Sequence, residues 1–242
     1  MEKNNQWGAQ GSVLGPLLFV IYINDLPDGL FNTFKMYADD SKVIAEVEDT
    51  NSESKLQKDI NKIKDWCDKW SMSLNGKKCK VMHFGKKNPE KDYFIGNGNE
   101  RVLLGKTEAE KDLGVIIENN GKSSKQIQSA VSRANSVLGR MRKTFQFFNI
   151  RLFKIIYPTY IRPHLEFASA VWNSMNKADI KKLEGIQKRA TKMVIELRSM
   201  EYEERLEVLG LTTLESRRKR GDLIQIYKIL RGRRRGYRYG VS

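Results

Sequence analysis

The stretch Phe34-Lys35-Met36-Tyr37-Ala38-Asp39-Asp40-Ser41-Lys42-Val43-Ile44 is the starting point for the fold of this chain. Apolar residues lead up to two adjacent aspartates and an apolar pair follows, which predicts a β-hairpin with a tight turn carrying Asp39 and Asp40. A solvated turn is one interpretation, because aspartate side chains readily bond to nearby backbone. The other is a magnesium site, because two neighbouring carboxylates repel each other unless a divalent cation holds both ionised.

A second motif lies just before this hairpin. Residues 10–27 read Gln-Gly-Ser-Val-Leu-Gly-Pro-Leu-Leu-Phe-Val-Ile-Tyr-Ile-Asn-Asp-Leu-Pro, which predicts a loop and then a helix. Ser12 is placed to cap this helix. Its expected apolar face consists of Leu14, Leu17, Leu18 and Ile21. In this order and at this distance, the loop, the helix and Tyr37-Ala38-Asp39-Asp40 resemble the palm of reverse transcriptases from non-long-terminal-repeat retrotransposons, the LINE-like group and especially its jockey-like branch.

The resemblance implies roles for individual residues. Asp39 and Asp40 are the expected catalytic residues and the expected ligands of Mg²⁺, in a site that holds two ions in the complete enzyme. Gln10, Gly11 and Tyr37 match positions that lie against the incoming nucleotide and the template. The family's proline before the glutamine is Ala9 here, which makes the loop less rigid.

Two later segments extend the resemblance. Trp70-Ser71-Met72-Ser73-Leu74-Asn75-Gly76-Lys77-Lys78-Cys79 matches the next palm segment, in which Lys78 corresponds to a catalytic lysine near the leaving pyrophosphate. A solvated turn lysine is the alternative for Lys78. Residues 111–117 predict a β-branched strand like the family's primer grip, with Leu113 and Gly114 as the grip residues. The glycine marks either a close approach by a ligand or another backbone, or a bulge.

Composition points to a polyanionic partner. The 242 residues carry a formal net charge of +15, from 44 Lys and Arg against 29 Asp and Glu. Nucleic acid is the commonest partner of so basic a chain, and an anionic membrane is the rival. No apolar run approaches the roughly 20 residues of a spanning helix, and the polar start lacks the apolar core of a signal peptide. Two cysteines fit a reducing compartment, so the expected location is nuclear or cytoplasmic.

The middle of the chain predicts one long helix and short strands. A capping box at Thr50 and Glu53 opens a helix with apolar residues at 56, 60, 63, 66 and 70. Its charged residues, Asp59 among them, are expected to face solvent. Trp66 and Trp70 either pack in the core or stack on bases. A strand is expected over 78–84, and a hairpin joins 92–95 to 101–104.

From Gly121 onward the pattern is helical and basic. Capping boxes are expected at Ser123 to Gln126 and at Thr212 with Glu215, and a helix beginning at Ile150 is expected to stop at Pro158. The buried stripe of the first of these helices is expected to comprise Ile127, Ala130, Val131, Ala134, Val137, Leu138 and Met141. The last helix is expected to turn Leu223, Ile226, Tyr227 and Leu230 inward.

The predicted fold class is α+β. Residues 1–120 are expected to form a partial polymerase palm, a small antiparallel sheet with packed helices. An all-α thumb over 121–198 and a C-terminal helical extension over 199–232 follow. The basic tail 233–242 is expected to be disordered; it either binds nucleic acid or continues past the point where the resemblance stops.

The resemblance implies an RNA-directed DNA polymerase whose partners are an RNA template, a DNA primer and deoxynucleoside triphosphates. In the family a further catalytic aspartate and the fingers lie upstream of the Gln10-Gly11 loop, so we expect no polymerisation by this chain alone. The alternative is a non-catalytic protein that grips nucleic-acid phosphates through basic helices between Lys122 and Arg235.

Overall fold

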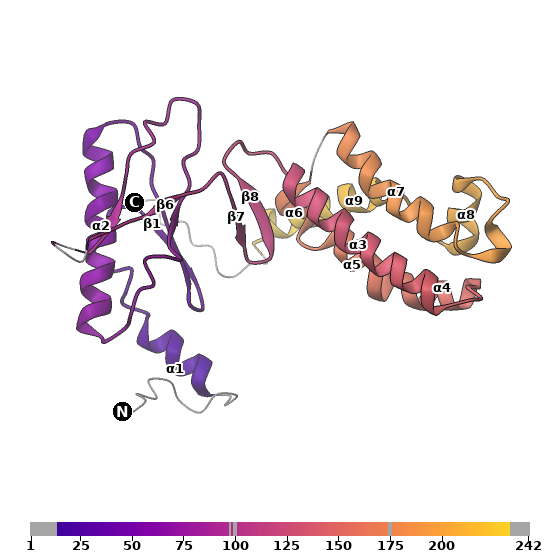
Figure 1. Cartoon of the computed structure of the whole chain (residues 1–242), viewed down its shortest axis with the longest axis horizontal. Coiled ribbons are helices and arrows are strands. Elements are labelled where there is room, and N and C mark those ends of the chain that lie inside the picture. Colours follow the sequence, from indigo (N-terminus) through magenta and orange to yellow (C-terminus); the bar gives the residue numbers. More distant parts are fainter. Residues whose placement is uncertain (1–13, 97, 99–100, 174–175, 233–242) are drawn as a thin grey trace. The chain divides into compact units, whose positions relative to one another are not determined.

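The computed structural model describes residues 14–96, 98, 101–173 and 176–232 (Figure 1). The chain divides into two compact units, Met1–Glu108 and Ala109–Ser242. Helices and small two-stranded sheets make up both, so the mixed α and β class is confirmed. The hairpin over 109–118 groups with the helical unit, whereas the sequence placed the boundary near residue 120.

The first unit combines helices with three short strand pairs. Strands β1 and β2 are antiparallel, as are β4 and β5, whereas β3 and β6 run parallel. The hairpin expected over 92–104 is therefore confirmed. The strand expected over 78–84 is paired only at Lys80 and Val81. The elements are α1 (Leu14–Tyr22), β1 (Thr33–Tyr37), β2 (Asp40–Ile44), α2 (Thr50–Lys69), β3 (Lys80–Val81), β4 (Phe94–Ile95), β5 (Val102–Leu103) and β6 (Gly105–Lys106).

The core of this unit lies between α2 and β4. Tyr93, Ile95 and Leu104 are buried there, with Leu56 and Ile60 of α2 packed against them. Gln57 of α2 binds the backbone of β4 in both directions, because its Nε2 donates to Phe94 O at 2.8 Å and its Oε1 accepts from Phe94 N at 3.0 Å. The amide thus satisfies backbone groups that a further strand would otherwise have to pair.

Helix α2 begins one residue earlier than predicted. Asp49, and not Thr50, is the N-cap, and its side chain accepts from Ser52 N at 2.7 Å. The Ser52 hydroxyl also donates to Asp49 Oδ1 at 2.6 Å, and this bond, together with the backbone bond, lowers the pKa of the Asp49 carboxyl. Both residues carry a side-chain oxygen suited to capping, so the pattern alone did not separate them.

Helix α1 is held by aromatic contacts at its end. Tyr22 lies edge-on to Trp66 and Trp70 of α2, at centroid distances of 6.0 and 5.4 Å, and its hydroxyl donates to Trp70 O at 2.6 Å. Trp66 donates through Nε1 to Asp25 Oδ1 at 3.1 Å. Both tryptophans therefore make contacts within the unit, although Trp70 stays 38% exposed.

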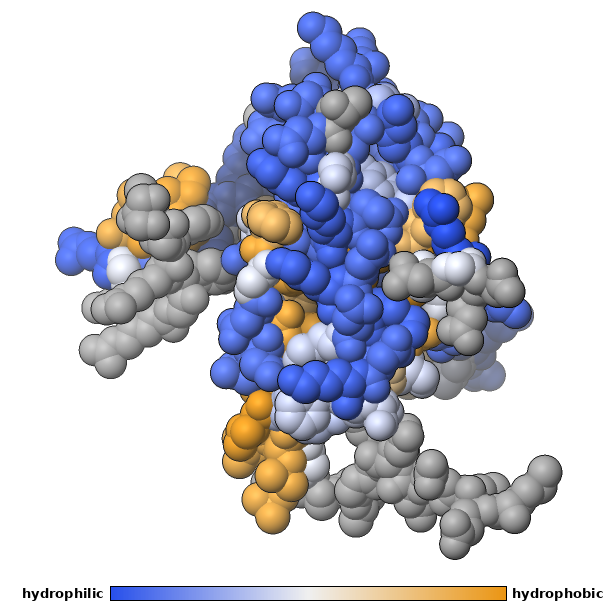
Figure 2. Space-filling model, turned by 90° about the vertical axis from the view of Figure 1, so that its left-hand side faces the viewer, coloured by the Kyte–Doolittle hydropathy of each residue, from blue (hydrophilic) through white to orange (hydrophobic). Residues whose placement is uncertain are grey.

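The apolar face predicted for α1 is not buried. Leu14, Leu17, Leu18 and Ile21 are all exposed, between 57% and 64%. This expectation was wrong because hydrophobic periodicity shows which face favours burial, but not whether the covering element lies in the same part of the chain. Figure 2 shows hydrophobic surface at the lower end, where α1 lies in Figure 1.

The second unit is a hairpin followed by helices. Strands β7 and β8 pair antiparallel, and α3 packs against α5 and α7. The elements are β7 (Ala109–Asp112), β8 (Val115–Glu118), α3 (Ser124–Thr144), α4 (Ile150–Ile156), the π-helix η2 (Tyr157–Ile161), α5 (Arg162–Glu166), α6 (Ser169–Trp172), α7 (Lys177–Thr191), the 3₁₀-helix η3 (Ile195–Leu197), α8 (Tyr202–Leu209) and α9 (Leu214–Leu230).

The apolar stripe of α3 is confirmed. Ile127, Ala130, Ala134, Leu138 and Met141 are buried, and Val131 and Val137 are partly buried against the same core. Such a stripe at steps of three and four residues is the side that an amphipathic helix packs inward.

The capping box predicted at the start of α3 was wrong. Gln126 is buried and its Oε1 accepts from Ile116 N of β8 at 2.9 Å. Glu118 of β8 serves the helix end instead, since its Oε2 accepts from Lys125 N at 2.8 Å. A side chain of the helix thus accepts from the backbone of the hairpin, and a side chain of the hairpin accepts from the backbone at the start of the helix. A carboxylate at a helix N-terminus is also favoured by the helix dipole.

Pro158 does not stop its helix. Helix α4 passes into a single π-helical turn and then into α5, which begins just before Pro163. Proline lacks an N–H and clashes with the preceding turn, and the wider π-turn accommodates it without ending the helical path.

A buried polar network ties the helices together around Gln187 of α7. Tyr157 OH donates to Gln187 Oε1, and Gln187 Nε2 reaches Tyr202 OH and Thr212 O, both at 3.0 Å. Burial raises the pKa of the Tyr157 phenol well above its ordinary value, so the group stays a neutral donor. This network links η2, α7 and α8 and the start of α9.

The end of α9 is exposed, contrary to the sequence prediction. Leu223, Ile226, Tyr227 and Leu230 range from 50% to 80% exposed, whereas Leu214 and Arg218 near the start are buried. The N-cap is Thr213, which accepts from Ser216 N at 3.2 Å, and not Thr212. In the described part of the chain no helix combines the length and the apolar character needed to cross a membrane.

Candidate functional site

The Asp39-Asp40 hairpin forms as the sequence predicted. Tyr37 and Asp40 are the last cross-strand pair, so Ala38 and Asp39 form a two-residue turn and Asp40 begins β2. Ala38 has φ of 52°, a left-handed conformation that is unfavourable for a residue with a Cβ. A positive φ at the first of two turn residues is typical of a type II′ hairpin, where glycine is the usual choice. Both carboxylates are exposed, and so is Tyr37.

A buried carboxylate in α2 fixes the start of this hairpin. Asp59 is fully buried, which corrects the prediction that it faces solvent. It accepts from Phe31 N, Asn32 N and Asn32 Nδ2, each at 2.8 Å. Residues 31 and 32 directly precede β1. A fully buried carboxylate needs such bonds, because its charge loses its hydration. Asp59 therefore positions the strand that leads to Asp39.

The turn supplies ligands of the kind that Mg²⁺ prefers. Two carboxylates next to each other offer hard oxygen donors, and exposure leaves room for water and phosphate ligands. Within the described ranges no three His, Cys, Asp or Glu side chains gather into a metal cluster. Asp39 and Asp40 thus fit a divalent ion, and the described part of the chain adds no third ligand to them.

Of the other predicted residues of the first part of the chain, the structure describes Lys78 but not Gln10 and Gly11. Lys78 is exposed in the turn before β3, where its backbone N–H donates to Asn75 O at 2.9 Å. Gln10 and Gly11 lie outside the residues that the structure describes.

Leu113 and Gly114 form a turn and not the interior of a strand. They connect β7 to β8, with φ of 45° and 87°. Positive φ at both turn positions is the type I′ pattern, for which leucine is an unusual first residue. The ring of Phe167 lies so close to Gly114 that an added Cβ would be 3.1 Å from its Cε1 atom. The sequence predicted a ligand, another backbone or a bulge at this glycine; the structure has a tight turn with an aromatic side chain against it.

We expect Gly114→Ala to destabilise the second unit by about 1–3 kcal/mol, from left-handed strain and from the contact with Phe167. The matched control is Gly139→Ala, in the middle of α3 with nothing within 4 Å of its added Cβ. That change should stabilise the helix by about 0.5–1 kcal/mol. Urea unfolding monitored by circular dichroism distinguishes the two, and shifts in the same direction would contradict the turn geometry.

Comparison with known proteins decides the family. The family model described as "Reverse transcriptase (RNA-dependent DNA polymerase)" matches residues 6–131, more than half of the chain and a range that includes both hairpin turns. The chain belongs to the reverse transcriptase family. The resemblance drawn from the Asp39-Asp40 motif and its upstream loop is thereby confirmed.

Two curated relatives are named as RNA-directed DNA polymerases of mobile elements. The "RNA-directed DNA polymerase from mobile element jockey" of Drosophila funebris is 26% identical over 204 residues. The "Probable RNA-directed DNA polymerase from transposon X-element" of Drosophila melanogaster is 22% identical over 196 residues. Each match covers 76% of this chain but only 21% of the relative. No solved structure matches the chain.

Sequence reasoning missed three features of this reverse transcriptase family member. Asp59 was grouped with solvent-facing charges, although it sits one position from Ile60 of the apolar stripe. Lys35 and Lys42 are cross-strand partners. This pairing follows from the register of the predicted hairpin, but it was not noted from the sequence. A groove lined by Lys125 and Arg133 of α3 and by Lys182 of α7 depends on the packing of two helices, so no local sequence pattern indicates it.

Proposed function

We propose that this chain is the part of an RNA-directed DNA polymerase that carries its metal-binding turn. The observation that carries the proposal is the exposed Asp39-Asp40 pair on a strained two-residue turn, in a chain of the reverse transcriptase family. Backbone strain held at an exposed turn is common where a side chain must be aimed at a ligand. The proposed substrates are deoxynucleoside triphosphates with an RNA template and a DNA primer.

In this proposal Asp39 is the principal ligand of the metal and Asp40 a weaker or structural one. A bound Mg²⁺ pair supplies electrostatic stabilisation of the attacking and leaving oxygens. Tyr37, in the cross-strand pair that closes the turn, would offer its ring beside the carboxylates for positioning the nucleotide. Lys78 would neutralise charge, or donate a proton, at the departing pyrophosphate.

The two units take the corresponding structural roles. We assign the first unit to a partial palm, and the helices of the second unit to a thumb and a C-terminal extension. The hairpin tip at Leu113 and Gly114 is the candidate primer grip, because an exposed leucine at a fixed turn offers a firm apolar contact to a sugar.

A chimeric enzyme tests the proposal. Residues 6–131 replace the matching segment of the jockey polymerase, which supplies the rest of the polymerase. Extension of a DNA primer on an RNA template should appear with Mg²⁺ and should depend on Asp39. A chimera that folds, as judged by a cooperative thermal transition, but extends primer equally well with Asp39→Asn would contradict the proposal.

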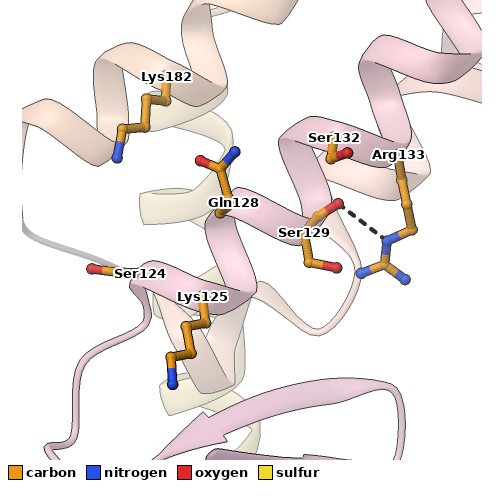
Figure 3. A pocket seen from close by; sticks show the side chains of 7 residues that line it. All are labelled: Ser124, Lys125, Gln128, Ser129, Ser132, Arg133 and Lys182. Atoms are coloured by element: carbon orange, nitrogen blue, oxygen red, sulfur yellow. Dashed lines mark hydrogen bonds between the residues drawn. The ribbon is translucent and has the colours of Figure 1, made fainter.

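A groove on the second unit favours nucleic-acid binding as a second candidate function. It has a volume of about 590 Å³ and is lined by α3 and by Lys182 of α7 (Figure 3). No acidic residue lies in α3. Arg133 Nε donates to Ser129 O at 3.4 Å, and Lys182 pairs with Asp179 at 3.1 Å. The lining residues are Ser124, Lys125, Gln128, Ser129, Ser132, Arg133 and Lys182.

Cations and hydroxyls over successive turns of one helix suit a sugar-phosphate backbone. The double variant Lys125→Ser/Arg133→Ser should weaken binding of a primer–template duplex about tenfold at low salt and lower the salt-dependence slope by about 2. The matched control is Arg151→Ser/Lys154→Ser, which removes the same charge from exposed positions of α4. Fluorescence anisotropy measures the affinity of each double variant for the duplex, and an equal loss of affinity in the two would count against a specific groove.

A further inference from the structure

The hairpin that carries Asp39 has two unlike faces. Side chains at paired positions of an antiparallel ladder project to the same side, and successive pairs alternate. Phe34 with Val43 and Met36 with Ser41 lie on one face, where the three apolar residues are half-buried. The pairs Thr33–Ile44, Lys35–Lys42 and Tyr37–Asp40 share the other face.

Two lysines are directly opposed on this second face. Paired positions bring Cβ atoms within about 4.5–5.5 Å, and like charges directly opposite each other destabilise a sheet. Lys35 is exposed and Lys42 half-buried. Lysines on strand edges do protect small sheets from aggregation, but staggered positions would give that protection without opposing the two charges. The opposed arrangement therefore concentrates two positive charges at one place on this face of the hairpin.

The lysine pair is the next pair along from Tyr37 and Asp40 on the same face. Neighbouring positions on one face of a strand are about 7 Å apart, twice the rise per residue. Two positive charges so near a carboxylate turn oppose the binding of a divalent cation there. An anion between the lysines and the cation removes this conflict, since it attracts both.

We propose that Lys35 and Lys42 together bind a phosphate group beside the Asp39-Asp40 turn. This inference rests on the proposed polymerase function, because the phosphate is then one that the reaction brings to the turn. The two sources are the triphosphate of the incoming nucleotide and a backbone phosphate of the nucleic-acid strand that ends at the turn. Both present oxygens that an ammonium pair binds by charge-assisted hydrogen bonds.

The test uses the complete 242-residue chain and two probes. One is dTTP with Mg²⁺, followed by isothermal titration calorimetry, and the other is a short fluorescein-labelled single-stranded DNA, followed by anisotropy. The variant is Lys35→Gln/Lys42→Gln. The matched control is Lys55→Gln/Lys58→Gln, which removes the same charge from the exposed face of α2 in the same unit.

We expect the hairpin variant to lose about tenfold or more in affinity for at least one probe, while the control stays within about twofold. Loss with dTTP alone identifies the nucleotide as the source, and loss with DNA alone identifies the strand. Thermal unfolding of the hairpin variant should remain cooperative, so that a loss of affinity is not a loss of folding. Equal losses in variant and control, or no binding of either probe by the unmodified chain, would overturn the proposal.

The result is separable from that of the polymerase test. If Asp39→Asn leaves chimeric primer extension intact, the proposed function fails whatever the lysines bind. If extension depends on Asp39 but the lysine variants bind both probes as the control does, only the phosphate site fails.

Discussion

Asp39→Asn should lower primer extension by the chimeric polymerase by about a thousandfold or more. The substitution keeps the size of the side chain but removes the charge that holds the metal, and metal stabilisation of a transition state is worth several kcal/mol, where each ~1.4 kcal/mol is a factor of ten in rate. Asp40→Asn should cost less, because Asp40 begins β2 and is the weaker proposed ligand. The rate of single-nucleotide incorporation under excess substrate measures the effect of each substitution.

Asp28→Asn is the matched control, an exposed aspartate in the loop after α1 that is no part of the proposed site. It should leave extension within about twofold, in line with an ordinary surface substitution. In the unmodified chain, Mn²⁺ should broaden the backbone amide resonances of residues 37–41, and Asp39→Asn should abolish this broadening. Broadening that persists in the variant would place the metal elsewhere.

Much of the hairpin and the helical stripes could be predicted because their information is local. Alternating residues around two turn-forming aspartates specify a hairpin, and the regular apolar spacing of α3 specifies its buried side. The predicted N-cap of α2 was one residue late and that of α9 one residue early, because two adjacent residues in each case carry a suitable side-chain oxygen. Local pattern does not choose between such neighbours.

The remaining errors have non-local causes. The run 111–117 reads as one strand because Leu113 shows no preference for positive φ, and only the pairing of β7 with β8 makes it a turn. The exposed apolar residues of α1 and of the end of α9 follow the predicted periodicity, but the described part of each unit provides no cover for them. Whether an apolar helix face is buried depends on an element that covers it as well as on the spacing of its apolar residues.

The groove on α3 and α7 illustrates the same limit for a site. Lys125 and Arg133 lie two helical turns apart in the sequence, and Lys182 comes from another helix. Composition predicts that a basic chain meets a polyanion, but only the packing of α3 on α7 assembles the cations into one concave surface.

Asp59→Ala should destabilise the first unit by about 3 kcal/mol, the largest stability effect that we expect in this chain. The substitution leaves Phe31 N, Asn32 N and Asn32 Nδ2 without their acceptor, and each unsatisfied donor in a buried setting costs about 1–3 kcal/mol, partly offset by entering water. Asp59→Asn should cost less, since the amide keeps one acceptor oxygen. Urea unfolding of the three proteins gives the order directly.

The hydrogen bonds that Asp59 accepts also connect the stability of the first unit to the Asp39-Asp40 turn. Asp59 lies in α2, far along the sequence from Asp39, yet it fixes the two residues from which β1 starts. Amide hydrogen exchange over residues 33–44 should therefore accelerate by about a hundredfold in Asp59→Ala, the ratio that corresponds to about 3 kcal/mol. Asp65→Ala, on the exposed side of the same helix, should leave both stability and exchange nearly unchanged. If the two variants accelerated exchange equally, the position of the Asp39 turn would have to depend on the helix as a whole and not on this carboxylate.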